Sequence, residues 1–257
     1  MNRFFPYMIL TAAIATTPLS SLIADDVAEG VAEILDDDAA MPPAPKTPAE
    51  VLYGTLSRLP SDPVKLTGSL IMRKRRGIVV KEVPFEIELL WGAEPKGAKY
   101  RLFDGFGRPL STLVASVDKD GRVLCGVRDG DGRELPEPDL LDQVEGTDIT
   151  WLDITLSYLW WNDATLVGAE EFKGALCDIV AVRPPSPLKG CAEVRLWVDR
   201  RRGFLRQAEQ IDEKGERVRH MWVASVGKIG DRWMIRNMEV KREGTGVMTK
   251  LHVDTLE

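Results

Sequence analysis

Few residues of this chain have the types and spacings that chemistry requires. The 257 residues include two histidines, His220 and His252, and three cysteines, whose spacings match no zinc pattern. The sequence contains no Gly-x-Ser-x-Gly elbow for a nucleophilic serine and no glycine-rich phosphate loop. The carboxylate pair Asp118 and Asp120 precedes Gly121 in a turn, where aspartate is common for conformational reasons. We therefore expect no enzymatic activity, no cofactor and no metal ion.

The three cysteines, Cys125, Cys177 and Cys191, bear on the redox compartment. In an oxidising compartment two of them could form a disulfide and leave one over, and the sequence does not choose among the three pairings. If residues 184–189 form the loop of a hairpin, Cys177 and Cys191 are offset along its strands. That offset disfavours a bond between these two.

The N-terminus has the pattern of a secretory signal peptide over residues 1–24. Arg3 gives a positive start, Phe4–Thr17 is apolar or small without charge, and Ala24 precedes an acidic pair. The apolar run is shorter than the ~20 residues of a membrane-spanning helix. We expect export to the periplasm with cleavage after Ala24, and an uncleaved membrane anchor is the alternative.

Residues 25–47 are expected to form a flexible acidic and proline-rich linker. Asp25–Glu50 contains eight acidic residues and one basic residue, and three prolines fall within Met41–Pro45. Such a segment buries too little apolar area to offset its ordering entropy; an acidic docking arm is the alternative. The remaining residues, 51–257, contain 32 acidic and 32 basic residues, so they offer no positive surface for nucleic acid.

Residues 48–257 are predicted to form one mainly β domain. A helix is indicated over Pro48–Leu59 by its first proline, its apolar spacing and the proline that follows it. Beyond it, apolar and polar residues alternate, as in Phe85–Trp91, which is typical of antiparallel strands with one buried face. Strands are predicted near residues 64–73, 78–91, 98–104, 110–118, 122–127, 175–183, 191–199, 204–212, 216–226, 231–241 and 247–256.

Glycine-containing turns separate these strands in an up-and-down meander. About eleven successive strands accumulate right-handed twist, so the sheet must curl, close or split. Between the two groups of strands, Asp148 is expected to cap a helix that carries Trp151 to Trp160. The predicted fold class is a curved antiparallel sheet that forms an incomplete β-barrel, with helices over its concave side.

Several segments resemble the LolA-like outer-membrane lipoprotein-sorting proteins. Thr147–Asp153 is similar to a segment of that family, and Val194–Asp199 with Ala208–Gly215 resembles its tryptophan- and aspartate-containing hairpin. Ser225–Trp233, Met238-Glu239-Val240 and Thr249-Lys250-Leu251 continue the match, which covers roughly residues 50–257. The order and spacing of these pieces carry the resemblance, because each piece alone is common.

The resemblance implies a periplasmic carrier or chaperone whose apolar hollow shelters lipoprotein acyl chains or lipid. A hollow of this kind is needed because each CH₂ removed from water is worth ~0.8 kcal/mol. The expected partners are that ligand and an envelope membrane protein, and the sequence indicates no oligomeric state. The ligand-binding residues expected on the sheet are Phe85, Ile87, Leu89, Trp91, Val194, Leu196, Val198, Trp222 and Met238. Those expected on the helical segment are Trp151, Leu156, Leu159 and Trp160.

Other readings of the same residues stay open. Any sheet covered by helices needs an apolar face, so each of these side chains could be ordinary core. A non-carrying docking module for an envelope transporter or other partner would have a filled interior and an exposed apolar patch. The basic run Arg73–Arg76 lies at a predicted hairpin turn, either as a solvated turn or as a contact for anionic lipid or a membrane partner.

Overall fold

The computed structural model describes residues 41–229 and 232–256. The predicted signal peptide, residues 1–24, and most of the predicted linker, residues 25–47, lie outside the described residues.

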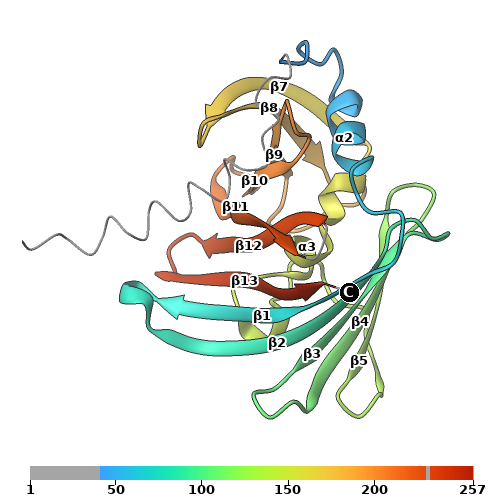
Figure 1. Cartoon of the computed structure of the whole chain (residues 1–257), viewed down its shortest axis with the longest axis vertical. Coiled ribbons are helices and arrows are strands. Elements are labelled where there is room, and N and C mark those ends of the chain that lie inside the picture. The colour runs from blue at the N-terminus through green and yellow to red at the C-terminus, as the bar shows by residue number, and fades with distance from the viewer. Residues whose placement is uncertain (1–40, 230–231, 257) are drawn as a thin grey trace, which may run out of the picture. The chain divides into compact units, whose positions relative to one another are not determined.

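One curved antiparallel sheet dominates the fold (Figure 1). Within the described residues it has thirteen strands in the spatial order β6-β5-β4-β3-β2-β1-β13-β12-β11-β10-β9-β8-β7. The chain therefore starts in the middle of the sheet, runs outward to one edge at β6, and returns from the other edge at β7. The strands are β1 Val64–Lys74, β2 Val79–Leu90, β3 Gly97–Phe103, β4 Pro109–Val117, β5 Val123–Asp129, β6 Glu134–Leu135, β7 Asp163–Phe172, β8 Ala175–Arg183, β9 Glu193–Asp199, β10 Leu205–Ile211, β11 Arg217–Ile229, β12 Arg232–Arg242 and β13 Val247–Leu256.

The predicted fold class is confirmed, and all eleven predicted strands are present. β6 and β7 were not predicted. β6 has only two residues, and β7 has a register shift at Gly168 and two consecutive acidic residues, Glu170 and Glu171, which break its alternation. Both are edge strands, so the sheet does not close into a barrel.

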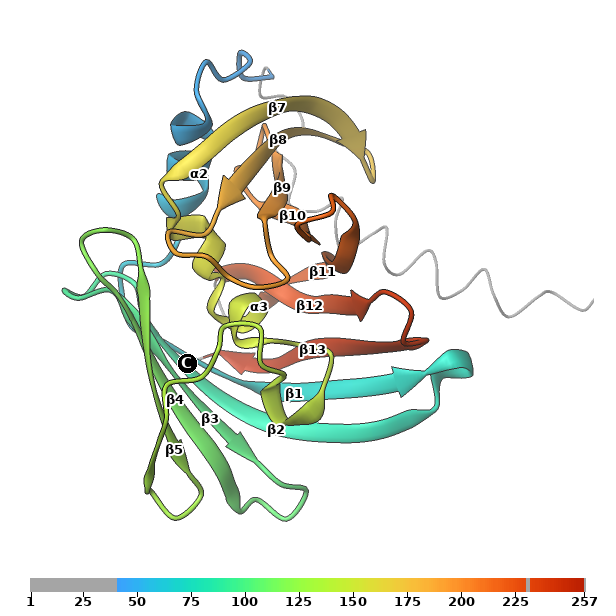
Figure 2. The same ribbon diagram turned by 180° about the vertical axis from the view of Figure 1, so that it is seen from behind.

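Short helices connect and cover the strands. They are α2 Pro48–Leu56 and α3 Trp151–Thr155, with the 3₁₀ turns η1 Arg75–Gly77, η2 Val144–Gly146 and η3 Ser157–Trp160. The segment from β6 to β7 contains η2, α3 and η3 and crosses one face of the sheet, as Figure 2 shows from behind. None of the helices in the described ranges has the length and hydropathy needed to cross a bilayer.

Local capping explains where the two α-helices begin and end. Thr47 caps α2 by accepting a hydrogen bond from the Glu50 amide at 3.3 Å, and the helix ends at Leu56 rather than at Leu59. The prediction that Asp148 caps the next helix was wrong. Thr150 caps α3 in a capping box with Asp153, and Leu156 in the left-handed conformation ends it after five residues.

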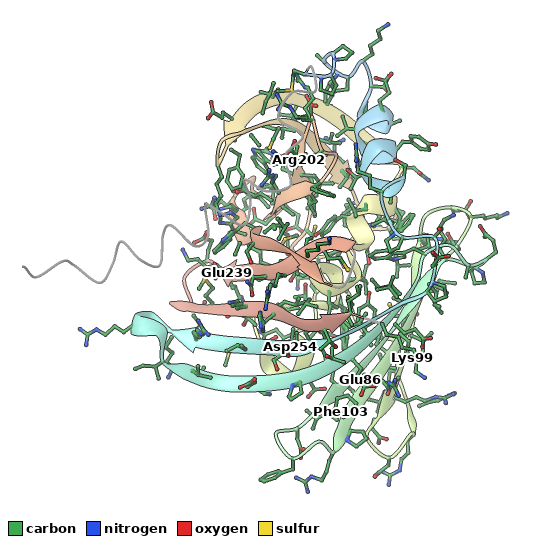
Figure 3. All side chains as sticks on the ribbon, in the orientation of Figure 1. Glu86, Lys99, Phe103, Arg202, Glu239 and Asp254 are labelled. Atoms are coloured by element: carbon green, nitrogen blue, oxygen red, sulfur yellow. The ribbon has the colours of Figure 1, made fainter. Side chains whose placement is uncertain are left out.

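The main core lies on the concave face of the sheet and under the helical segments. On β2, Phe85, Ile87 and Leu89 are buried in it, and Glu86 between them faces outward, where it pairs with Arg101 at 2.7 Å (Figure 3). A second, smaller cluster lies on the opposite face of β8 and β9. Its members are Phe172, Ala175, Cys177, Ile179 and Trp197.

The two buried cysteines lie in different cores. Cys177 belongs to the outer cluster and Cys191 to the main core, and these two and Cys125 are free thiols. Burial is the first cause that raises the thiol pKa, to about 11 for Cys125 and Cys177 and to about 12 for Cys191.

We expect the native protein to react slowly with iodoacetamide at pH 8, because a raised thiol pKa leaves little thiolate. Without reductant, alkylation in denaturant should add three groups by mass spectrometry. Addition of a single group would show that two of the cysteines form a disulfide and would contradict the structure.

Gly68 allows the two halves of the sheet to meet. It lies on β1 opposite Phe85 of β2 and Val253 of β13, at a register shift. A Cβ atom added there would lie 2.0 Å from the carbonyl oxygen of His252 and 2.6 Å from the Phe85 ring. The ring therefore occupies the space that a side chain would need.

Gly68→Ala is expected to lower the free energy of unfolding by at least about 2 kcal/mol, because backbone must move to admit the methyl group. Gly126→Ala on β5 is the matched control, since nothing lies within 4 Å of its added Cβ. Urea denaturation should show a change within about 0.5 kcal/mol for the control. Equal effects of the two substitutions would rule out the steric explanation.

Candidate functional site

A cavity of about 590 Å³ lies between the concave face of the sheet and the helical segments. Its lining is mainly apolar and comes from α2, α3, η3 and the inward faces of several strands. The apolar lining residues are Leu59, Pro60, Val64, Leu66, Ile87, Leu89, Trp91, Tyr100, Ile154, Leu156, Leu159, Phe204, Leu205, Met221, Val223, Met234, Ile235, Met238, Leu251 and Val253.

Strand register brings these side chains together from distant parts of the sequence. Val223 of β11 lies opposite Met238 of β12, which lies opposite Leu251 of β13. Directly paired residues of antiparallel strands point to the same face, so each such row forms a continuous strip of the cavity wall.

Six of the thirteen predicted ligand-binding residues line this cavity. They are Ile87, Leu89, Trp91, Leu156, Leu159 and Met238. Whether they contact a ligand stays a prediction. Five other predicted residues are buried in the main core and do not line the cavity. They are Phe85, Trp151, Val194, Leu196 and Val198.

Trp160 belongs to a different hollow. This second hollow, of about 630 Å³, lies between α2, the β2–β3 and β4–β5 turns, and the end of η3. Trp160 and Trp161 line it together with Tyr53 of α2. Leu159 lines both hollows and therefore stands in the wall between them.

Trp222 does not face the cavity, although the alternation of β11 assigned it there. Its strand neighbours Met221 and Val223 line the cavity, so Trp222 points to the opposite face. Its cross-strand partner Gln207 also lies opposite Trp197 of the outer cluster. The centroids of the Trp222 and His220 rings lie 4.7 Å apart, with the ring planes tilted by 39°.

Most of the apolar lining residues that the sequence did not indicate come in pairs from β1, β11, β12 and β13. The spacing of Val64 with Leu66 and of Leu251 with Val253 carried a usable period-two signal. On β11 both faces carry apolar residues, and Arg219 made the inward set look like the polar one. The structure shows that Arg219 is 7% exposed.

Arg219 is buried because the covering segment provides its partners. Its guanidinium donates to the carboxylate of Asp153 on α3 and to the backbone carbonyl of Asp148. Asp153 also accepts hydrogen bonds from the amide and hydroxyl of Thr150, at 2.8 and 2.9 Å. One carboxylate that lines the cavity thus holds the start of α3 to strand β11.

The cavity reaches solvent beside the segment that follows α2. Arg58, Ser61 and Asp62 line the cavity and are exposed at the same time. At the other side, the Tyr100 hydroxyl is buried and donates to the Ile154 carbonyl at 3.2 Å. The site therefore combines an apolar interior with a polar rim, which suits a ligand with a greasy part and a polar end.

The described residues contain no group of three or more side chains positioned to hold a metal ion. The walls of the cavity are mainly apolar, and Asp153 among its lining residues is paired with Arg219.

Arg219→Met is expected to lower the free energy of unfolding by about 3–5 kcal/mol, because it leaves the Asp153 charge buried without its partner. Arg217→Met on the same strand removes the same charge from partly exposed ion pairs with Glu209 and Glu243 and should cost less than about 1 kcal/mol. Urea denaturation of the two variants compares them. Losses of similar size would contradict a fastening role for Arg219.

Comparison with known proteins places the fold. A family model described as "Uncharacterized protein" matches residues 132–257, and no curated protein matches the chain. A DUF1329 family protein from Desulfovibrio piger superposes with a TM-score of 0.66 at 17% identity, covering 82% of this chain and 92% of that one. A putative outer membrane lipoprotein-sorting protein domain from Vibrio parahaemolyticus gives 0.68 at 15%, covering 81% and 90%.

A LolA superfamily protein from Nitrosomonas europaea gives a TM-score of 0.61 at 11% identity, covering 83% of this chain and 94% of that one. At these identities the likeness concerns the fold. It confirms at that level the resemblance to LolA-like proteins that the sequence indicated.

Proposed function

We propose that this protein is a periplasmic carrier that binds a hydrophobic ligand, lipoprotein acyl chains or lipid, in the cavity of its half-barrel. The observation that carries the proposal is the apolar cavity of about 590 Å³ with an exposed polar rim. A fully packed core would leave no such space, since protein interiors normally reach the density of organic crystals.

The physical advantage of the cavity lies in transfer free energy. Moving an acyl chain from a membrane into water costs a free energy of ~0.8 kcal/mol for each exposed CH₂. A chain in transit between membranes therefore needs an apolar container. Side chains such as Met221, Met234 and Met238 suit a container with variable contents, because methionine is flexible and polarisable.

The periplasmic location and the role in outer-membrane lipoprotein sorting belong to the proposal. The signal-peptide pattern of residues 1–24 supports export. The likeness in fold to a putative outer membrane lipoprotein-sorting protein domain supports the kind of cargo. The proposed role is non-enzymatic, and it requires a membrane-bound donor or acceptor of the ligand as partner.

The alternative, a docking module that carries nothing, requires a filled interior. The cavity favours the carrier over this alternative. An empty apolar volume lowers the free energy of unfolding, and a docking module would gain nothing in return.

Val223→Asp is expected to reduce uptake of a fluorescent fatty acid at least tenfold, because it puts a carboxylate on the cavity wall. Trp222→Asp is the matched control: it adds the same charge one residue away on the opposite face, and uptake should be retained. Both variants should first show the circular dichroism and cooperative unfolding of the native protein. Val223→Trp, which fills the cavity without adding charge, is the substitute if Val223→Asp does not fold.

Mass spectrometry of an organic extract from protein purified without detergent should detect bound lipid. Absence of lipid together with no displacement of the fluorescent fatty acid by lipids would overturn the proposal. Equal uptake by folded Val223 and Trp222 variants would place the ligand outside this cavity.

A further inference from the structure

The hairpin between β1 and β2 carries a concentration of positive charge. We name residues 72–81, Met72 to Lys81, the basic arm. They contain five basic residues and no acidic one. The remainder of residues 51–257 carries a small acidic excess, so this charge is a local property.

The basic arm projects from the sheet. β3 pairs only with Phe85–Leu90 of β2, so Val79–Pro84 extends past β3 with one edge unpaired. Figures 1 and 2 both show the β1–β2 hairpin reaching beyond β3. The tip is an ordered turn: Arg76 and Gly77 have left-handed backbone conformations, and the Lys74 amide donates to the Ile78 carbonyl at 2.9 Å.

Three positive charges of the basic arm are not neutralised by any described residue. Within residues 41–229 and 232–256, Arg73, Lys74 and Arg76 form no ion pair, although other hairpin tips pair each arginine with an aspartate. The field of the arm reaches Lys250 on the neighbouring β13: burial first, and then the charge of Arg73, lower its pKa, while the charge of Glu239 raises it.

Three consecutive apolar residues of the basic arm face solvent. Ile78 is 60% exposed, Val79 50% and Val80 39%. β-branched apolar residues on a projecting hairpin with one unpaired edge are an aggregation hazard unless a partner covers them. The arm therefore presents apolar and cationic groups side by side.

That combination selects one kind of partner. A purely electrostatic ligand would leave Ile78–Val80 in water, and an apolar protein groove would leave the cations without counter-charges. The surface of an anionic bilayer satisfies both, because phosphate groups lie directly above acyl chains. We propose that the basic arm docks on bilayers that contain anionic phospholipid, with Ile78–Val80 at the boundary between headgroups and acyl chains.

The basic arm also contacts the cover of the cavity. Lys81 Nζ donates to the backbone carbonyl of Glu145 in η2, and Glu145 Oε1 accepts from the Ser111 hydroxyl at 2.7 Å. Docking through the arm would bring the segment that leads to α3 close to the membrane. Docking does not require an occupied cavity, so the surface is independent of the proposed carrier function.

The test is co-sedimentation of the full chain with vesicles of phosphatidylglycerol and phosphatidylcholine, compared with phosphatidylcholine alone. We expect binding to the anionic vesicles only, weakened by raised salt. Lys74→Glu with Arg76→Glu should weaken binding at least about tenfold, since each cation near an anionic surface contributes about 1 kcal/mol. Serine at Ile78, Val79 and Val80 together should also weaken it severalfold.

Matched controls separate the arm from general effects. Arg128→Glu with Arg133→Glu makes the same change in net charge at another exposed hairpin, and Val167→Ser removes a similarly exposed apolar side chain from β7. Both controls should bind like the native chain. All variants carry the same residues 1–40, so any binding through that segment is equal among them. No binding of the native chain to anionic vesicles, or equal losses in arm and control variants, would overturn the proposal. Fatty-acid uptake by the arm variants should be unchanged, which keeps this test separate from that of the carrier function.

Discussion

An open antiparallel sheet has one apolar face that its own strands cannot cover, and the rest of this structure follows from that constraint. The chain solves it with the segment between β6 and β7, which must cross from one edge of the sheet to the other. That crossing places α3 and η3 over the concave face. The ion pair of Arg219 with Asp153 fastens the crossing segment to β11. Two charges taken out of water need each other, so the pair sets where the cover lies.

The cover does not fill the space beneath it. Leu159 separates two hollows, an apolar one under α3 and a mixed one beside α2 that Trp160 and Tyr53 line. The apolar hollow meets solvent at Arg58, Ser61 and Asp62, directly after α2. A container of this form can take an oily chain into its interior and leave a polar end at the rim.

At several turns of the sheet, the charged residues are paired with a partner in the same turn. In three turns the same arrangement recurs: Asp104, Asp118 and Asp129 each accept two backbone hydrogen bonds and pair with the arginine four residues later. These hydrogen bonds hold the pKa of Asp104 and Asp118 below its ordinary value. In each of these turns the arginine is therefore neutralised by an aspartate of the same turn. The basic arm lacks such acids, which sets it apart as a surface that needs an external counter-charge.

The sequence alone determined eleven of the thirteen described strands, the turns and the class of fold, because period-two alternation and glycine-containing turns are local properties. It also placed Ile87, Leu89 and Met238 on the inward face, because charged or polar residues flank them and assign the opposite face to solvent. Only the tertiary structure decided which face of β11 points inward. Arg219 lies on that face because Asp153, 66 positions away in the sequence, neutralises its charge. The same holds for β6 and β7, whose partners rather than their own residues make them strands, and for the early end of α3 at Leu156. The partner of Arg219 is distant in sequence, and β6 and β7 are held by pairing with β5 and β8, so the local pattern of these residues did not reveal them.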